Sequence, residues 1–329
     1  MDEGWLRAPL SLAGKRIWVA GHAGMVGSAV CRALAGESCE VLMVSRDRLD
    51  LREQADVRAW MKAHRPDVIV LAAARVGGIG ANAAYPADFY HDNLMISANV
   101  IHGAYACGVE KLLFLGSSCI YPKDADLPIA PDALLRGVLE PTNEAYALAK
   151  IAGLKMAQAY RAQHGCDFIS AMPCNLYGPG DRYDLRGSHV IPALMMKAHE
   201  AARRGDDVLS VWGSGAPLRE FLYVDDLAAA LVFLLKYYSG SAPVNVGSGD
   251  EISIGDLARK VADVVGFRGG LVFDCSQPDG VYRKVMDSSV IKKAGWLPQI
   301  SLDCGLGLAY ADFCQMAFGE IKTAAVAES

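Results

Sequence analysis

A tyrosine and a lysine stand four residues apart in the stretch YALAK, which runs from Tyr146 to Lys150. Residues four apart lie on one face of an α-helix, so a phenol and an ammonium group would be neighbours. A phenol has an ordinary pKa of about 10, and a neighbouring positive charge favours its ionised form. The pair therefore predicts a group that transfers a proton, beside a lysine that influences its ionisation.

A second candidate for chemistry is the stretch GSSCIYPK, Gly116 to Lys123, which directly follows the apolar run KLLFL. Small polar residues are common where a buried strand ends in a turn. The same loop precedes YALAK by about 30 residues, a spacing that makes a chance occurrence of the tyrosine and lysine less plausible. Both interpretations, a simple turn and a reactive loop, stay open on the residues alone.

A glycine-rich turn precedes both of these motifs. The stretch GHAGMVG comprises Gly21, His22, Ala23, Gly24, Met25, Val26 and Gly27, and it follows the apolar run RIWVAG. Such a turn lets backbone N–H groups approach a pyrophosphate, while the N-terminus of the next helix stabilises its charge. The turn predicts a dinucleotide site, and its GxxGxxG spacing is typical of short-chain dehydrogenases.

The residue that follows the second apolar run bears on which dinucleotide is bound. An acidic residue there would accept a hydrogen bond from a ribose 2′-hydroxyl and favour NAD. The run EVLMVS is followed instead by Arg46, whose guanidinium can pair with a 2′-phosphate. NADP(H) is therefore the expected cofactor, and a solvated surface arginine is the alternative.

Positioning these residues requires a sheet with helices on both faces. Apolar runs without polar alternation begin at Arg16, Glu40, Asp67, Lys111 and Asp167. The predicted helices between them are Val26–Ala35, Glu53–His64, Pro86–Cys107 and Glu144–His164. This alternation predicts an α/β fold with a doubly wound parallel sheet, a Rossmann domain, and the later run VNVGSG predicts one more strand.

The regular alternation of apolar runs and predicted helices ends after about residue 178. The polar stretch GPGDRYDLRGSHVIP is followed by a predicted helix from His189, the strand VLSVWG, and segments that suggest a small helical cap. We expect an NADP-binding Rossmann domain formed by residues 12–178 with about 220–248 and 302–320. A smaller, mostly helical substrate-binding domain is expected from about 179–219 and 249–301.

Composition excludes several other classes of protein. The net charge is −5 and no cluster of five or more basic residues occurs, which argues against a nucleic-acid partner. No apolar run reaches the roughly 18–20 residues of a membrane helix. The nine cysteines are odd in number and contain no CxxC pair, so we predict free thiols and no metal site. The first residues lack the pattern of a signal peptide, and a cytoplasmic enzyme is expected.

These motifs together resemble an extended short-chain dehydrogenase that modifies nucleotide sugars, and more narrowly the family of GDP-L-fucose synthases. The resemblance runs from about Arg16 to Leu308. It rests on LGSSCIYPK, EPTNEAYALAK, NLYGPGD, SHVIPAL, VWGSG, REFLYVDD and QPDG. It implies NADPH-dependent conversion of GDP-4-keto-6-deoxy-D-mannose to GDP-L-fucose, by epimerisation at C3 and C5 and then reduction at C4.

The resemblance also implies roles for individual residues. Ser117, with Ser118 as the alternative, would hydrogen-bond the reacting oxygen, and Tyr146 and Lys150 would serve the reduction. Cys119 would be the base and His189 the acid of the epimerisation, chemistry that suits a thiolate near a positive charge and an imidazole. Besides the glycine turn and Arg46, the implied cofactor contacts are Leu115, Gly116, Ser117, Ser118, Tyr146, Lys150, Pro173, Cys174, Asn175, Leu176 and His189. The implied substrate contacts are Asn175, Lys197, Trp212, Arg219 and Asp279.

One departure and several alternatives accompany this interpretation. Some relatives carry arginine where this chain has Ala23, which leaves 2′-phosphate recognition mainly to Arg46. Core packing is the alternative for Cys119 and for Trp212. A structural role is the alternative for His189, and a solvated helix face for Lys197. Another nucleotide-sugar reductase or 4-epimerase, or a non-catalytic NADP-sensing protein, would share the fold. The family's two long helices pair across a two-fold axis, which implies a homodimer through a four-helix bundle made by Pro86–Cys107 and Glu144–His164.

Overall fold

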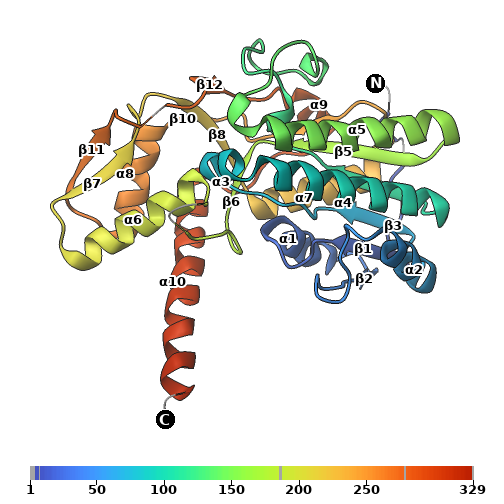
Figure 1. Ribbon diagram of the computed structural model, residues 1–329, viewed down its shortest axis with the longest axis horizontal. Helices are drawn as coiled ribbons and strands as arrows, with labels where there is room; N and C mark the ends of the chain where they lie inside the picture. The colour runs from blue at the N-terminus through green and yellow to red at the C-terminus, as the bar shows by residue number, and fades with distance from the viewer. Residues whose placement is uncertain (1–3, 7, 185–186, 278, 328–329) are drawn as a thin grey trace.

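The carboxyl ends of a parallel sheet position most of the predicted site. In the computed structural model, which describes residues 4–6, 8–184, 187–277 and 279–327, a six-stranded sheet has the order β2-β1-β3-β4-β5-β9 (Figure 1). Its strands are β1 (Arg16–Ala20), β2 (Glu40–Leu42), β3 (Val68–Leu71), β4 (Lys111–Leu115), β5 (Asp167–Pro173) and β9 (Val244–Val246). All neighbouring pairs are parallel. The predicted doubly wound sheet is confirmed, as is the extra strand in VNVGSG.

Four helices of this part of the fold agree with their predicted bounds to within one residue at each end: α1 (Met25–Leu34), α2 (Gln54–His64), α4 (Pro86–Ala106) and α5 (Glu144–His164). A further helix, α7 (Val224–Tyr237), was not among the predicted ones. Helices α2, α4 and α5 lie side by side, whereas α1 packs on α7 (Figure 1). Right-handed crossovers place α1, which leads from β1 to β2, on the opposite face of the sheet from α2, α4 and α5, because the strand order reverses at β1.

Strand β2 is shorter than predicted. The run EVLMVS was expected to continue to Ser45, but the strand ends at Leu42 and the backbone then leaves the sheet. β2 lies at the edge of the sheet and pairs with β1 alone, and the side chain of Met43 is already 57% exposed. Ser45 and Arg46 therefore lie in a loop beyond the strand rather than at its last residue.

Two smaller sheets complete the fold. Strands β10 (Glu251–Ser253), β8 (Leu218–Tyr223) and β12 (Arg283–Lys284) form one sheet with β6 (Asn175–Tyr177), and β7 (Val208–Trp212) pairs with β11 (Gly270–Asp274). Helices α6 (Val190–Arg204), α8 (Ile254–Val265) and α10 (Leu302–Ala327) accompany them. The second lobe thus contains helices as expected, together with strands that the description "mostly helical" understated.

The remaining short elements line or border the site. They are α3 (Ile79–Ala84), η1 (Ser118–Ile120), η2 (Pro131–Ala133), η3 (Pro141–Asn143) and α9 (Ser289–Lys293). Leu185 and Arg186 of the polar stretch, and Pro278 of QPDG, lie outside the described residues. Within the described ranges no helix has both the length and the apolarity needed to cross a membrane.

Buried apolar side chains in the described chain form two clusters. The larger surrounds the six-stranded sheet, and the smaller packs α6, α8 and β7 together. Ile291 and Trp296 belong to the larger cluster, whereas Leu306 and Ala309 of α10 belong to the smaller. The division into two domains stays a proposal. By their packing, Ile291 and Trp296 belong with the larger domain, and Leu306 and Ala309 belong with the smaller one.

Candidate active site

A cavity of about 1050 Å³ is lined by the ends of β1, β3, β4 and β5 on one side and by β7, β8 and β12 on the other. Ligands of doubly wound folds bind at the carboxyl ends of the strands, where the strand order reverses. Every residue that the sequence predicted for catalysis, cofactor binding or substrate binding lines this cavity. Segments far apart in the chain are therefore brought to a single place.

The glycine turn has the geometry of a dinucleotide site. Gly21 has φ +94°, and a Cβ there would lie 2.6 Å from the backbone nitrogen of Ala73. A Cβ at Gly27 would lie 2.0 Å from the carbonyl oxygen of Gly21, so neither position tolerates a side chain. The turn leads into the N-terminus of α1, which stabilises an anionic group. The buried Nδ1 of His22 has no hydrogen-bond partner among the described residues. These features fit a bound dinucleotide.

Arg46 lies at the same end of the cavity. Its side chain is exposed, lines the cavity and forms no ion pair among the described residues. A guanidinium without a carboxylate partner is suited to pair with a phosphate. This placement agrees with the interpretation of Arg46 as the 2′-phosphate contact, although the residue sits in a loop and not at the end of the strand.

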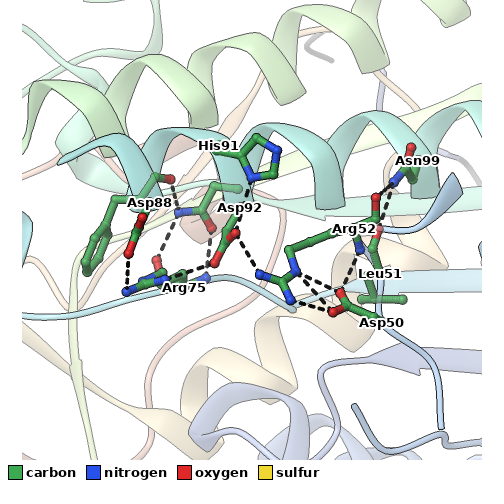
Figure 2. A network of polar contacts seen from close by, with 10 residues as sticks. Asp50, Leu51, Arg52, Arg75, Asp88, His91, Asp92 and Asn99 are labelled. Atoms are coloured by element: carbon green, nitrogen blue, oxygen red, sulfur yellow. Dashed lines mark hydrogen bonds and ion pairs between the residues drawn. The ribbon is translucent and has the colours of Figure 1, made fainter. Parts of the chain in front are cut away.

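A polar network, which the sequence did not predict, holds this wall of the cavity together (Figure 2). The buried carboxylate of Asp92, on α4, pairs with Arg52 and with Arg75, each at 3.1 Å. Arg52 also pairs with Asp50 at 2.6 Å, and Arg75 with Asp88 at 3.0 Å. The network joins the loop before α2, the segment after β3 and the start of α4, all of which adjoin the cavity.

Hydrogen bonds from the arginines lower the pKa values of two carboxylates in this network. Burial alone would raise the pKa of Asp92, but hydrogen bonds from Arg52 and Arg75 outweigh it and lower the pKa below its ordinary value. The hydrogen bond from Arg52 lowers the pKa of Asp50 to about 2. Both carboxylates are consequently ionised at neutral pH and hold the arginines in fixed positions.

Tyr146 and Lys150 project from α5 toward the loop after β4. Lys150 is buried, and its Nζ donates a hydrogen bond of 2.8 Å to the carbonyl oxygen of Leu115. The Nζ atom lies 5.9 Å from the centroid of the Tyr146 ring and 5.1 Å from that of Phe114. The predicted helical face is therefore confirmed, with the ammonium beside the aromatic rings.

The protonation states differ from the sequence expectation. Burial raises the pKa of Tyr146, the Cys119 thiol adds to the rise, and only a hydrogen bond with Ser117 opposes it. Burial also lowers the pKa of Lys150 to about 8. The prediction that Lys150 would favour the phenolate is not met, because desolvation outweighs the ammonium. Tyr146 is a protonated phenol, which suits a proton donor.

The GSSCIYPK loop is shaped by its first serine. Ser117 precedes η1, and its Oγ accepts a hydrogen bond of 3.2 Å from the backbone N–H of Cys119. Because Ser117 is also the serine bonded to Tyr146, the geometry supports it over the more deeply buried Ser118. The Sγ atom of Cys119 lies 4.0 Å from the Nζ of Lys284, a residue that the sequence did not indicate.

His189 stands directly before α6. Its side chain is open to the cavity, yet the surrounding protein atoms lower the pKa of its imidazole below the ordinary value. The ring is therefore neutral at neutral pH. This departs from the expectation of an imidazole that titrates near neutrality.

Two of the predicted substrate residues contact each other at the far end of the cavity. The Nζ of Lys197, on α6, lies 4.7 Å from the centroid of the Trp212 ring. Trp212 is 60% exposed, which removes core packing as its explanation. An exposed indole held by a cation offers a flat surface on which an aromatic base can stack.

The other substrate candidates line the cavity from β6, β8 and the segment before β12. Asp279 accepts hydrogen bonds from the backbone N–H and the hydroxyl of Ser214, at 2.9 and 2.7 Å. Asn175 donates to the carbonyl oxygen of Glu220 at 2.9 Å. Burial lowers the pKa of Arg219, and the Asp279 carboxylate opposes this. The carboxylate of Asp279, the amide of Asn175 and the guanidinium of Arg219 thus line the same cavity.

Lys284 and the Asp92 network are the features that sequence reasoning missed. Lys284 is separated from Cys119 by 165 residues, and it belongs to a strand of two residues. The basic pair Arg283–Lys284 shortly after QPDG was the only available signal. It carries no periodicity, so only the folded chain reveals that Lys284 and Cys119 meet.

Comparison with known proteins places the chain among sugar-nucleotide enzymes. Residues 17–247 match the model of the NAD dependent epimerase/dehydratase family. A GDP-L-fucose synthase of Sinorhizobium fredii is 58% identical over 302 residues, covering 92% of this chain and 96% of that protein. The GDP-L-fucose synthase of Escherichia coli is 47% identical over 311 residues, covering 92% and 97%. A solved GDP-L-fucose synthetase of Naegleria fowleri bound to NADP is 28% identical with a TM-score of 0.88, covering 94% of this chain and 98% of that one.

Proposed function

Since the chain belongs to the NAD dependent epimerase/dehydratase family, and within it to the GDP-L-fucose synthases, we propose that it converts GDP-4-keto-6-deoxy-D-mannose to GDP-L-fucose with NADPH as reductant. The conversion comprises epimerisation at C3 and C5 and reduction at C4. The observation that carries the proposal is the meeting of Ser117, Cys119 and Tyr146 in one cavity whose other end is a dinucleotide-binding turn.

The residues at the turn fit NADP(H). Gly21, Gly24 and Gly27 leave room for the pyrophosphate, and Arg46 is the partner for the 2′-phosphate. When bound, the cofactor supplies the hydride that reduces the ketone. Lys150, whose Nζ lies beside the carbonyl oxygen of Leu115, would hydrogen-bond the nicotinamide ribose.

For the reduction, Ser117 and Tyr146 bind the C4 oxygen. The raised pKa of Tyr146 keeps its proton on the phenol until charge develops on that oxygen. The phenol then donates its proton as the ketone becomes an alcohol. Ser117 holds the phenol and the oxygen in position by hydrogen bonds.

For the epimerisation, Cys119 and His189 act at the carbons that flank the ketone. The 4-keto group acidifies the hydrogens at C3 and C5, because the resulting enolate spreads its charge onto oxygen. At each of these carbons the Cys119 thiolate takes the proton and becomes a thiol, and His189 donates one proton to the opposite face. Proton exchange with solvent restores both groups before the second carbon reacts. The anionic diphosphate of the substrate favours the protonated ring, which offsets the effect of the surrounding protein.

The remaining cavity residues bind the nucleotide part of the substrate. Trp212 provides a surface for the base, and Lys197 and Arg219 are cations for the diphosphate. Asn175 and Asp279 supply polar contacts near the sugar and the nucleotide. The smaller lobe is therefore the nucleotide-sugar-binding domain, and the larger lobe the NADP-binding domain.

The proposal includes a homodimer in the cytoplasm. Helices α4 and α5 lie side by side and expose the large apolar residues Tyr90, Tyr105 and Leu148. Two such helix pairs would bury these side chains in a four-helix bundle. The described cysteines are free thiols, which suits a reducing compartment.

The function is tested by supplying a panel of GDP- and dTDP-linked 4-keto-6-deoxy sugars with NADPH. We expect turnover of GDP-4-keto-6-deoxy-D-mannose to a product with inverted C3 and C5, identified by NMR. Reduction of a different sugar nucleotide without inversion would instead assign the chain to another reductase of the family. Binding of NADPH without any turnover would favour the sensing alternative.

A further inference from the structure

Lys284 lines the cavity although no motif marks it. The strand β12 pairs with β8, in a register that places Lys284 opposite Arg219. Its neighbour Arg283 forms an ion pair with Glu251. Lys284, one residue further along the strand, is half-buried and lines the cavity, where its Nζ approaches the Sγ of Cys119 to 4.0 Å.

No carboxylate among the described residues forms an ion pair with Lys284. The carboxylate of Glu220, on the neighbouring strand β8, accepts hydrogen bonds from the backbone N–H groups of Gly249 and Met286, at 2.6 and 3.1 Å. The polar contact that the Lys284 ammonium does make is the one with the Cys119 thiol.

The other titratable groups around Cys119 do not supply this charge. Tyr146 faces it from α5 as a neutral phenol, and Lys150 is directed to the carbonyl oxygen of Leu115. Cys174, beside β5, is buried, and burial raises the pKa of its thiol well above the ordinary value. Lys123 is exposed at the cavity wall.

We propose that Lys284 is a positioning residue for the epimerisation, because its ammonium pairs with the Cys119 thiolate and holds the base in its ionised form. This inference rests on the proposed function for its consequence, but the ion pair itself does not. A thiolate beside a lysine is stabilised relative to the thiol. In the reaction the thiolate takes the proton from carbon and becomes a thiol, while Lys284 keeps its own protons and charge.

The pair is tested without substrate, by alkylating the whole protein with iodoacetamide between pH 5 and 10. Peptide mass spectrometry then follows the modification of Cys119. In Lys284→Met we expect the rate at pH 7 to fall at least about tenfold and its pH midpoint to rise by about one unit or more. Lys284→Arg, which keeps the charge, should restore most of the reactivity. The exposed Cys275 is the internal control, since its rate should be the same in each variant.

Two comparisons keep this test decisive. Lys123→Met removes a cavity lysine that does not contact Cys119, and it should leave the alkylation profile unchanged. NADPH binding by Lys284→Met, measured by fluorescence, shows that the variant is folded, and Lys284→Gln is used if it is not. An unchanged Cys119 profile in a folded variant without the charge would overturn the proposal.

The consequence for the reaction is measured separately. With the keto sugar in D₂O, Lys284→Met should incorporate deuterium at C3 and C5 at least about tenfold more slowly at pH 7, and a higher pH should recover part of the rate. Wild-type exchange in the variant would also overturn the proposal. If no keto sugar were accepted by the wild-type protein, the proposed function would fail while the alkylation result still decided the ion pair.

Discussion

At the scale of single residues, burial determines the protonation of Tyr146 and Lys150 more strongly than their mutual contact does. Both groups lose solvent at the end of β4, which raises the pKa of the phenol and lowers that of the ammonium. The pair and its helical face were predictable from the spacing of the two residues, but the extent of their burial was not. A protonated phenol is nevertheless the form that a ketone reduction requires.

The lysine makes this part of the site sensitive to pH. The pKa of Lys150 is lowered to about 8, so its charge is present below that pH and is lost above it. We expect NADPH oxidation to decline as the pH rises above about 8. In Lys150→Arg, whose guanidinium stays ionised, the rate is lower but this decline is absent. A wild-type rate that still increases at pH 9 would show that the charge of Lys150 is not needed.

Cofactor selection depends on another single residue, Arg46. Replacing it with alanine removes a charge-assisted contact that contributes on the order of 1.5–3 kcal/mol. The dissociation constant for NADPH should increase at least about tenfold, while that for NADH is nearly unchanged. Arg48→Ala, which removes another exposed arginine from the same loop, is the matched control. Equal losses for both cofactors in Arg46→Ala would refute the assignment.

At the scale of elements, the sequence predicted what local periodicity encodes. The bounds of α5 match the prediction, since its capping glycine, Gly165, lies in the left-handed region that ends helices. The end of β2 and the strand β12 depend instead on which neighbours a strand finds in the sheet. The same holds for the approach of Lys284 to Cys119, because no local rule relates residues in two distant strands and loops.

The Asp92 network shows how elements are fastened around the cofactor end of the cavity. Asp92→Asn leaves Arg52 and Arg75 facing a neutral amide in place of a carboxylate. Both arginines are about one-third exposed, so solvent reduces the loss, and we expect a decrease of about 1–3 kcal/mol in the free energy of unfolding. Urea denaturation measures it, with Asp88→Asn, at the exposed end of the network, as a control that should change little.

The same network makes the stability of the folded chain decrease at low pH. Asp50 and Asp92 have lowered pKa values in the folded chain, about 2 for Asp50. Their contribution to stability is therefore present above the ordinary carboxyl pKa and is lost as the pH falls from about 4 toward 2. In Asp92→Asn this part of the acid destabilisation should be smaller. An identical acid profile in the variant would count against the network.

At the scale of the whole molecule, two clusters of buried side chains face one cavity, and the chain passes between them several times. Helix α6 and strand β7, which pack in the smaller cluster, carry Lys197 and Trp212 on their cavity side. The glycine turn and α5 adjoin the larger cluster. Helices α4 and α5 lie together at one side of the sheet, while α10 extends away from the body (Figure 1). This arrangement leaves the paired helices accessible to a second copy.

The homodimer is tested by light scattering at micromolar concentration. We expect twice the mass of the 35.1 kDa chain. Leu148→Glu places a charge on the exposed side of α5, where it would be buried in the proposed four-helix bundle, and it should shift the mass toward the monomer. Leu297→Glu changes a leucine that is also exposed but lies outside these helices, and it should leave the mass unchanged. A monomeric wild-type protein would contradict the proposal.

The central claim is that one short loop serves two separable reactions, with Cys119 acting on carbon-bound protons and Tyr146 on the ketone oxygen. The most direct measurement follows deuterium incorporation at C3 and C5 from D₂O together with NADPH oxidation, in Cys119→Ser and Tyr146→Phe. We predict that Cys119→Ser exchanges about 10²–10⁴ times more slowly, as is typical when a general base is lost, while slow reduction of the unepimerised ketone persists. Tyr146→Phe should continue to exchange both hydrogens while its NADPH oxidation collapses. Wild-type exchange in Cys119→Ser would contradict the account and leave the cysteine with a packing role alone.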